Sequence, residues 1–308
     1  MSILYFLEKL RCDFLDAIML LFTQLGEETA FLMLAIILLW CVDKKRGYFV
    51  LLVGFTGILA NQVLKLLFRV PRPWVLDPGF RPVEGAKAAA TGYSFPSGHT
   101  QSAVGAFGAI AATEKNRKIC IAAIALAVIV GFSRMYLGVH TPQDVLTSTM
   151  IAVALVLLLK PLVLGERKYA VPMLLLVITL LSVGYVLFSY YYPFPSDIDT
   201  DNLGHGRETG FTLLGCLLGF AVAYPVEKKW IRFPVNAVWW AQIIKVLVGL
   251  GIVLAVKAGL KSPLNSALGD CIGRTVRYFL MVLVAGTIWP LTFTWFAQLG
   301  KKNNKENE

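Results

Sequence analysis

Two histidines and an aspartate stand in turns where they could carry out nucleophilic and acid–base chemistry. His99 lies in the Pro-Ser-Gly-His sequence of TGYSFPSGHTQS, and His140 precedes Asp144 by four residues. Two imidazoles can supply a nucleophile and a general acid, and a carboxylate can orient one imidazole and balance its charge. If a helix begins near residue 140, the four-residue spacing brings the Asp144 carboxylate to the His140 ring.

Basic side chains accompany these turns. Lys65 and Arg72 are two helical turns apart in KLLFRVPRP, and Arg134 comes six residues before His140. Arginine can bind phosphate oxygens in bidentate fashion, and phosphoryl transfer depends mainly on positioning and on positive groups around the equatorial oxygens. The basic residues therefore favour a phosphate-binding site.

Ser97 and Gly98 add an anion-binding helix end to this set. Ser97 can cap the helix that begins at Gly98, and free backbone N–H groups at a helix N-terminus bind anions. With the two histidines and the basic side chains, this end completes the parts that a metal-free phosphoryl transfer through a phosphohistidine requires.

Taken singly, each of these residues has a simpler explanation. A lone histidine is more often a packing residue, Asp144 could be only a helix cap, and Ser97 only an N-cap. Arg72 and Arg134 could be anchors that reach toward lipid headgroups. The joint spacing of the three clusters favours one shared site over separate roles.

The three clusters resemble the three-part signature of the type 2 phosphatidic acid phosphatase superfamily. They read Lys-x6-Arg-Pro, Pro-Ser-Gly-His and Ser-Arg-x5-His-x3-Asp, in that order and with no departure at a signature position. The family includes lipid phosphate phosphatases, undecaprenyl diphosphate phosphatases, glucose-6-phosphatase and the vanadium haloperoxidases. The resemblance covers about residues 28–165 of the chain.

The resemblance implies a role for each signature residue. His140 would attack phosphorus with Asp144 as its orienting partner, and His99 would protonate the leaving oxygen. The phosphoryl oxygens would be held by Lys65, Arg72, Ser97, Gly98 and Arg134. Such a reaction uses no metal and no cofactor.

The elements that must position these residues are membrane helices. The chain has 308 residues, of which 57% are hydrophobic, and its mean hydropathy is +0.67. Apolar runs of roughly 17 to 25 residues recur, which is the length that crosses a bilayer core. The sequence therefore predicts an all-α, polytopic membrane helical bundle rather than a soluble domain. About nine spans are expected, at 28–43, 47–68, 98–114, 119–138, 145–165, 169–192, 210–226, 236–257 and 271–299.

The chain is expected to have three parts. Residues 3–25 carry charged side chains between apolar positions, which indicates an amphipathic N-terminal helix at the interface within residues 1–27. Residues 28–165 contain the signature and are expected to form the catalytic bundle. Residues 166–308 are expected to be appended membrane helices.

Basic loops predict the orientation of the spans. DKKR, EKNRK, ERK, EKKWIR and the C-terminal tail all fall on one side, which the positive-inside rule assigns to the cytoplasm. The signature residues then lie on the extracytoplasmic side, and the C-terminus is cytoplasmic, in the cell (plasma) membrane. Because basic residues of a membrane protein are explained first by such loops, the net charge of +10 does not require a nucleic-acid partner, and none is expected.

Two further patterns are weaker. Residues 197–208 place acidic residues at spacings of a calcium loop but have Asn202 where that loop needs glycine, so a solvated acidic loop over the site is favoured. Gly215 and Gly219 form a GxxxG pair, for which close helix packing is the plain explanation and a homodimer the alternative. The five cysteines form no CxxC pair and are expected to be apolar packing residues.

We expect an integral-membrane lipid phosphate or diphosphate phosphohydrolase acting at the extracytoplasmic leaflet, with membrane lipids as its partners. Undecaprenyl diphosphate, phosphatidate-type lipids and sphingoid-base phosphates all stay open as substrates. A lipid-linked phosphotransferase shares every catalytic residue and differs only in the acceptor. A non-catalytic lipid-binding or lipid-translocating protein is the remaining alternative, although binding alone needs no nucleophile.

Overall fold

The computed structural model describes residues 1–299, which form helices joined by turns and contain no strand, as the all-α prediction requires. The helices before residue 140 are α1 (Ser2–Glu8), α2 (Asp13–Gln24), α3 (Glu28–Ile37), η1 (Leu38–Val42), α4 (Lys44–Phe68), α5 (Pro73–Leu76), α6 (Glu84–Ala89), α7 (Gly98–Thr113) and α8 (Arg117–Tyr136). Those after it are α9 (Pro142–Leu164), α10 (Ala170–Tyr191), α11 (Thr200–Val226), η2 (Glu227–Ile231), α12 (Trp239–Gly259), α13 (Lys261–Leu268), α14 (Asp270–Leu283), η3 (Val284–Ile288), η4 (Trp289–Thr292) and α15 (Phe293–Gln298).

The described chain divides into two compact units. Unit 1 consists of residues 1–34, 49–165 and 187–209, and unit 2 consists of residues 35–48, 166–186 and the chain from residue 210 onward. Every signature residue belongs to unit 1. The sequence predicted three parts from its motifs rather than from contacts, namely 1–27, 28–165 and 166–308. This division stays a prediction.

Seven helical segments of the described chain are long and apolar enough to cross a membrane, so the chain is a multi-pass membrane protein. They are Lys44–Leu76, Arg117–Tyr136, Pro142–Leu164, Ala170–Tyr191, Thr200–Ile231, Trp239–Leu268 and Asp270–Gln298. An eighth is reached if Asp13–Gln24 and Glu28–Val42, which bend by 53°, count as one broken span. The predicted total of nine is not confirmed, because α7 has only 16 residues and at about 24 Å is shorter than a hydrocarbon core of about 30 Å.

The N-terminal segment forms two helices where the sequence predicted one amphipathic helix over residues 3–25. The break between α1 and α2 lies at residues 9–12, and the charged residues around it bind other parts of unit 1. Arg11 Nε donates to the carbonyl of Tyr136 at 3.0 Å, and the Tyr136 hydroxyl donates to the Asp16 carboxylate at 2.9 Å. The charges that suggested an interfacial helix therefore hold this segment against the end of α8.

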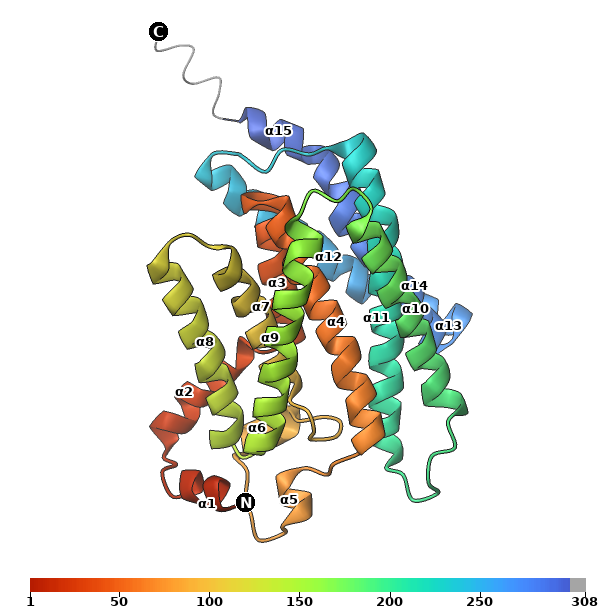
Figure 1. Cartoon of the computed structure of the whole chain (residues 1–308). Coiled ribbons are helices and arrows are strands. Elements are labelled where there is room, and N and C mark those ends of the chain that lie inside the picture. The colour runs from red at the N-terminus through yellow and green to blue at the C-terminus, as the bar shows by residue number, and fades with distance from the viewer. Residues whose placement is uncertain (300–308) are drawn as a thin grey trace. The chain divides into compact units, whose positions relative to one another are not determined.

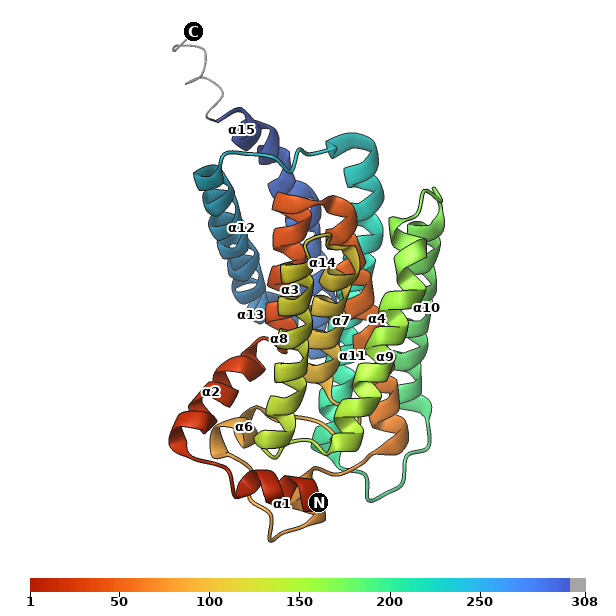
Figure 2. The same ribbon diagram turned by 60° about the vertical axis from the view of Figure 1, so that its left-hand side comes forward.

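Small residues allow close packing in the centre of unit 1. Helix α7 packs on α8 and on α9, and the three run side by side in both views (Figure 1, Figure 2). A Cβ built on Gly105 of α7 would lie 3.2 Å from the Val53 side chain of α4. The short helices α1 and α6 lie at the end of unit 1 where α8 turns into α9. This is the end that carries the His140 turn.

The segment predicted as an acidic loop is largely helical. Helix α11 begins at Thr200, so Asp201 and Glu208 lie in its first turns. An EF-hand site needs a twelve-residue non-helical loop that wraps around the ion. The structure therefore contradicts the calcium loop and places residues 200–208 in a helix, although the acidic side chains of Asp201 and Glu208 are exposed, as expected of a solvated segment.

Unit 2 accounts for the GxxxG pair within one chain. A Cβ built on Gly215 would lie 2.3 Å from the carbonyl oxygen of Thr275, and one on Gly219 would lie 2.8 Å from that of Phe279. These contacts join α11 to α14, which is the plain helix packing expected from the motif. A homodimer through the same face stays an untested prediction.

We predict that Gly138→Ala lowers the thermal midpoint of the protein in detergent. Gly138 has a φ of +77°, and a Cβ there would lie 2.6 Å from Arg11 Nη2 and 2.8 Å from the Phe80 ring. A side chain in the left-handed region costs roughly 1–2 kcal/mol even without a clash. Gly184→Ala is the matched control, because a Cβ at this helical position meets nothing within 4 Å. An equal midpoint for both variants would contradict the role assigned to Gly138.

Candidate active site

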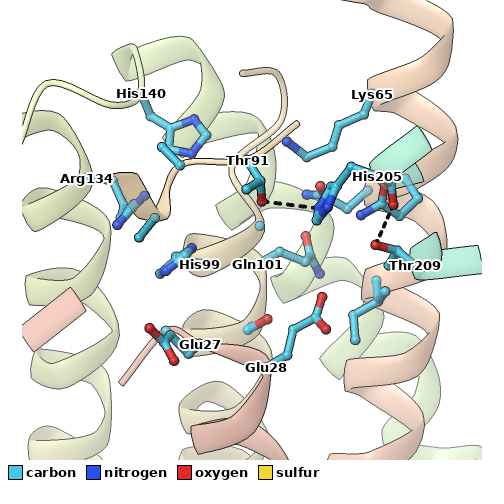
Figure 3. A pocket seen from close by; sticks show the side chains of 18 of the residues that line it. Glu27, Glu28, Lys65, Thr91, His99, Gln101, Arg134, His140, His205 and Thr209 are labelled. Carbon is cyan, nitrogen blue, oxygen red and sulfur yellow. Dashed lines mark hydrogen bonds between the residues drawn. The ribbon is translucent and has the colours of Figure 1, made fainter. Parts of the chain in front are cut away.

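One cavity of about 300 Å³ in unit 1 gathers most of the signature side chains. Its lining includes Lys65, Arg72, Gly98, His99, Arg134 and His140. Figure 3 shows Arg134 and His140 at one end of the cavity and Glu27 and Glu28 at the other, with His99 between them. Signature residues that are up to 75 positions apart in the sequence therefore face one space.

The turn before α9 fixes the geometry of the His140–Asp144 pair. Thr141 and Asp144 form a reciprocal capping box, in which the Thr141 N–H donates to Asp144 Oδ2 at 2.8 Å. The same Asp144 oxygen lies 3.3 Å from His140 Nδ1 and accepts a hydrogen bond from the Ser94 hydroxyl at 2.6 Å. Asp144 is thus a helix cap and the partner of His140 at once. With Nδ1–H directed at the carboxylate, the Nε2 lone pair of His140 points away from Asp144.

Arg72 lies directly against the other nitrogen of His140. Its Nη1 is 2.9 Å from His140 Nε2 and also donates to the Val139 carbonyl at 3.0 Å. Its Nε and Nη2 donate to the carbonyls of Gly92 and Thr91 at 3.0 and 2.6 Å. One guanidinium therefore holds the loop before α7 against the loop after α8, with His140 at the junction.

Lys65 and Arg134 complete a positively charged end of the cavity. Lys65 Nζ donates to the carbonyl of Tyr93, in the same loop that Arg72 binds. Arg134 is only 1% exposed, and its Nη1 donates to the Thr23 hydroxyl at 2.5 Å. Its Nε has no hydrogen-bond partner among the described residues, although it is buried. A buried N–H group of this kind is a donor for an oxygen of a bound anion.

The N-terminus of α7 presents backbone rather than a hydroxyl group to the cavity. The Ser97 side chain is fully buried and accepts hydrogen bonds from the Thr100 N–H at 3.4 Å and from the Thr100 hydroxyl at 2.9 Å. Gly98 follows it and lines the cavity, and a Cβ built there meets nothing within 4 Å. Open space in front of a helix N-terminus leaves its N–H groups available to an anion.

The surroundings of His140 keep its imidazole neutral. Burial, with a side chain that is 1% exposed, lowers the pKa of His140 well below its ordinary value, and the positive charges of Arg72 and Arg134 lower it further. The neutral imidazole, whose Nδ1–H is held by a carboxylate, carries its lone pair on Nε2, and Arg72 Nη1 donates to that nitrogen. This is the form in which histidine can act as a nucleophile.

Several cavity residues lie outside the signature motifs. Ser94 binds Asp144, Thr91 Oγ1 lies 3.3 Å from His205 Nε2, and both Thr91 and His205 line the cavity (Figure 3). The loop predicted for residues 197–208 implied a solvated His205, whereas this residue lies on the first turns of α11 and lines the cavity. Asn61, Gln62, Gln101, Glu27 and Glu28 also line the cavity. Asn61 and Lys65 are one helical turn apart on α4, and this spacing could have indicated that they share a face.

We predict that inorganic phosphate binds at the Arg134 end of the cavity. Arg134→Gln should raise the dissociation constant of phosphate at least about tenfold, because a hydrogen bond to a charged group contributes about 1.5–3 kcal/mol. Binding can be followed through the phosphate dependence of the thermal midpoint. Arg117→Gln is the control, since Arg117 is an exposed arginine at the opposite end of α8. Arg134→Lys keeps the positive charge and serves as a second variant in case Arg134→Gln does not fold. Unchanged phosphate binding in both Arg134 variants would refute the site.

Comparison with known proteins places the geometry in a family. Residues 45–168 match the PAP2 superfamily, and residues 211–302 match the transmembrane extension of PAP2 superfamily phosphatases. No solved structure matches the chain.

Curated relatives match just under half of the chain. Undecaprenyl-diphosphatase BcrC of Bacillus subtilis is 34% identical over 142 residues, which cover 45% of this chain and 70% of that protein. Phosphatidylglycerophosphatase B of the same organism is 31% identical over 166 residues, which cover 49% of this chain and 76% of that protein. A probable sphingosine-1-phosphate phosphatase of Dictyostelium discoideum is 29% identical over 164 residues, covering 49% of this chain and 39% of that protein. The chain belongs to the PAP2 superfamily.

Proposed function

We propose that this protein is an integral-membrane lipid phosphatase that hydrolyses a lipid phosphate or diphosphate through a phosphohistidine on His140. The observation that carries the proposal is the cavity in which His140, held by Asp144, faces three basic side chains and a second histidine. The relatives support it, because all three bear the names of phosphatases that act on lipid phosphates or diphosphates.

The first half of the proposed reaction forms the phosphohistidine. The phosphoryl group enters the positive end of the cavity and takes over the donors of Arg72, Arg134 and Lys65 together with the N–H groups at Gly98. His140 Nε2 then attacks phosphorus while the bond from phosphorus to the leaving oxygen breaks. His99 donates a proton to that oxygen, and the Asp144 carboxylate balances the charge that develops on the His140 ring.

The second half returns the enzyme to its starting state. Water attacks phosphorus and loses a proton to His99, while the bond between phosphorus and His140 Nε2 breaks. Inorganic phosphate leaves, His140 is neutral again, and His99 carries the proton for the next turnover. Every proton has a named donor and acceptor among these residues, so the proposal uses no metal ion.

The location of the site is part of the proposal. The positive-inside rule assigns the basic loops to the cytoplasm, and the signature residues lie at the opposite ends of the predicted spans. The cavity would therefore face the extracytoplasmic leaflet of the plasma membrane, and the C-terminus would lie in the cytoplasm. Catalysis would reside in residues 28–165, and the later helices would be an accessory bundle. His205 and Thr209 modify that division, because they line the cavity although they follow residue 165.

We predict that the purified protein releases inorganic phosphate from lipid phosphates in detergent with EDTA present, and that His140→Ala abolishes release. Phosphate release that continues at the same rate with EDTA present supports the metal-free route.

We predict that His99→Ala accumulates the acid-labile phosphohistidine on His140 when the substrate is an activated aryl phosphate. The aryl leaving group needs no general acid, so the phosphohistidine still forms, but its hydrolysis lacks the base that His99 would provide. Mass spectrometry of rapidly quenched enzyme checks this. Full activity of His140→Ala would exclude the mechanism, and transfer to a lipid acceptor without phosphate release would indicate a phosphotransferase.

We predict that the acid limb of kcat/KM lies below the ordinary imidazole pKa of about 6.5. His140 must be neutral to attack; because its pKa is lowered, protonation inactivates it only at a lower pH, and activity persists into that range. Arg134→Gln removes a positive neighbour and should move the limb toward higher pH. The ionisation of the substrate is common to both enzymes, so a difference between the two profiles reports on the enzyme. Identical limbs would contradict the electrostatic role of Arg134.

A further inference from the structure

The cavity has a second end, whose chemistry differs from that of the phosphate-binding end. Glu27 and Glu28 come from the turn between α2 and α3 and lie at the end far from His140 (Figure 3). Asn61 lines the same cavity one turn before Lys65 on α4, and Gln101 lines it two residues after His99 on α7. Carboxylates instead of cations therefore lie at this end, and two amides line the same cavity.

The two amides are buried and lack partners. Asn61 and Gln101 are each 3% exposed, and no nitrogen or oxygen of either amide makes a hydrogen bond within the described residues. A Cβ built on Gly57 would lie 2.6 Å from Gln101 Nε2, so the Gln101 amide fits against the bare backbone of α4. Burying a polar group without a partner is unfavourable, and a ligand that forms hydrogen bonds to both amides would recover this free energy. The amides thus point to a ligand with hydrogen-bonding groups.

The direction of the proposed reaction identifies what part of the substrate would lie there. In phosphoryl transfer the attacking atom and the leaving oxygen are roughly in line on opposite sides of phosphorus. His140 would attack from one side, and His99 would protonate the leaving oxygen on the other. Figure 3 shows His99 between the His140 end and the Glu27 end. The leaving group therefore extends from His99 toward the amides and carboxylates.

Charge determines which leaving group fits this end. If the substrate is a diphosphate, the leaving group is itself a phosphate, which would lie beside Glu27 and Glu28. The negative charges of the two carboxylates would repel such a leaving group. An alcohol that carries a hydroxyl or ammonium group beside the ester oxygen would instead donate to the carboxylates and amides.

We propose that Asn61, Gln101, Glu27 and Glu28 form a subsite for the leaving alcohol, and that it selects phosphate monoesters of alcohols with an adjacent hydroxyl or ammonium group over lipid diphosphates. This rests on the proposed function, because the position of the leaving group follows from the roles of His140 and His99. The subsite narrows the substrate class to glycerol-type or amino-alcohol-type lipid phosphates.

The first experiment measures kcat/KM for 1-acylglycerol 3-phosphate, dodecyl phosphate and farnesyl diphosphate. The wild type should prefer 1-acylglycerol 3-phosphate to farnesyl diphosphate by on the order of tenfold or more. Glu27→Gln/Glu28→Gln should raise kcat/KM for farnesyl diphosphate and shrink that ratio, whereas Glu84→Gln, an exposed carboxylate outside the cavity lining, should leave the ratio unchanged. Gln101→Met, of similar shape, should lower kcat/KM for 1-acylglycerol 3-phosphate more than for dodecyl phosphate. A wild-type preference for farnesyl diphosphate that the double variant does not alter would overturn the subsite.

The second experiment needs no turnover. Monoacylglycerol, the alcohol product, should raise the thermal midpoint of His140→Ala more than dodecanol does, and the difference should vanish in His140→Ala/Gln101→Met. Equal effects of the two alcohols on His140→Ala would refute the subsite even if the wild type hydrolyses every ester. Selective stabilisation by monoacylglycerol without phosphate release from any ester would leave the subsite standing and refute the proposed function.

Discussion

A single buried carboxylate connects the parts of this active site. Asp144 closes the first turn of α9 through its capping box with Thr141, accepts a hydrogen bond from Ser94 and lies against Nδ1 of His140. Its side chain is almost completely buried, and a carboxylate in such a place is stable only when donors surround it. The same contacts that satisfy the charge also fix the imidazole, so local helix formation and the orientation of the proposed nucleophile depend on one group.

The basic side chains are also buried and need hydrogen-bond acceptors, which the loop before α7 supplies. Lys65 and Arg72 are nearly fully buried, where positive charge is costly without oxygen partners. The carbonyls of residues 91–93 supply those partners, and they belong to the segment that leads directly into Ser94 and the α7 N-terminus. Backbone oxygens thus satisfy the same cations that would hold phosphoryl oxygens. A substrate would exchange one set of oxygens for another, without first having to assemble the charges.

The resulting cavity is electrostatically divided. Its cations and helix N-terminus lie around His140, and its carboxylates lie at the far end beyond His99. This separation gives a direction to any substrate that carries a phosphate, because the phosphate is attracted to one end and repelled from the other. Two buried amides that have no hydrogen-bond partner among the described residues also line the cavity and add a requirement for hydrogen bonds that charge alone would not impose.

The sequence by itself determined which side chains could take part in phosphate chemistry. The tertiary structure decided which other residues join them in the cavity. Three motifs with fixed internal spacing predicted the set that includes Lys65, His99 and His140, because a helix end and an i, i+4 pair are local geometry that a sequence carries directly. Ser94, His205, Gln101 and Glu27 reach the cavity only through contacts between distant segments, which no local spacing encodes. The same reason explains the N-terminal segment, where charged residues that suggested an interfacial helix bind α8. It also explains the 197–208 segment, most of which forms the start of α11 although its acidic residues are exposed.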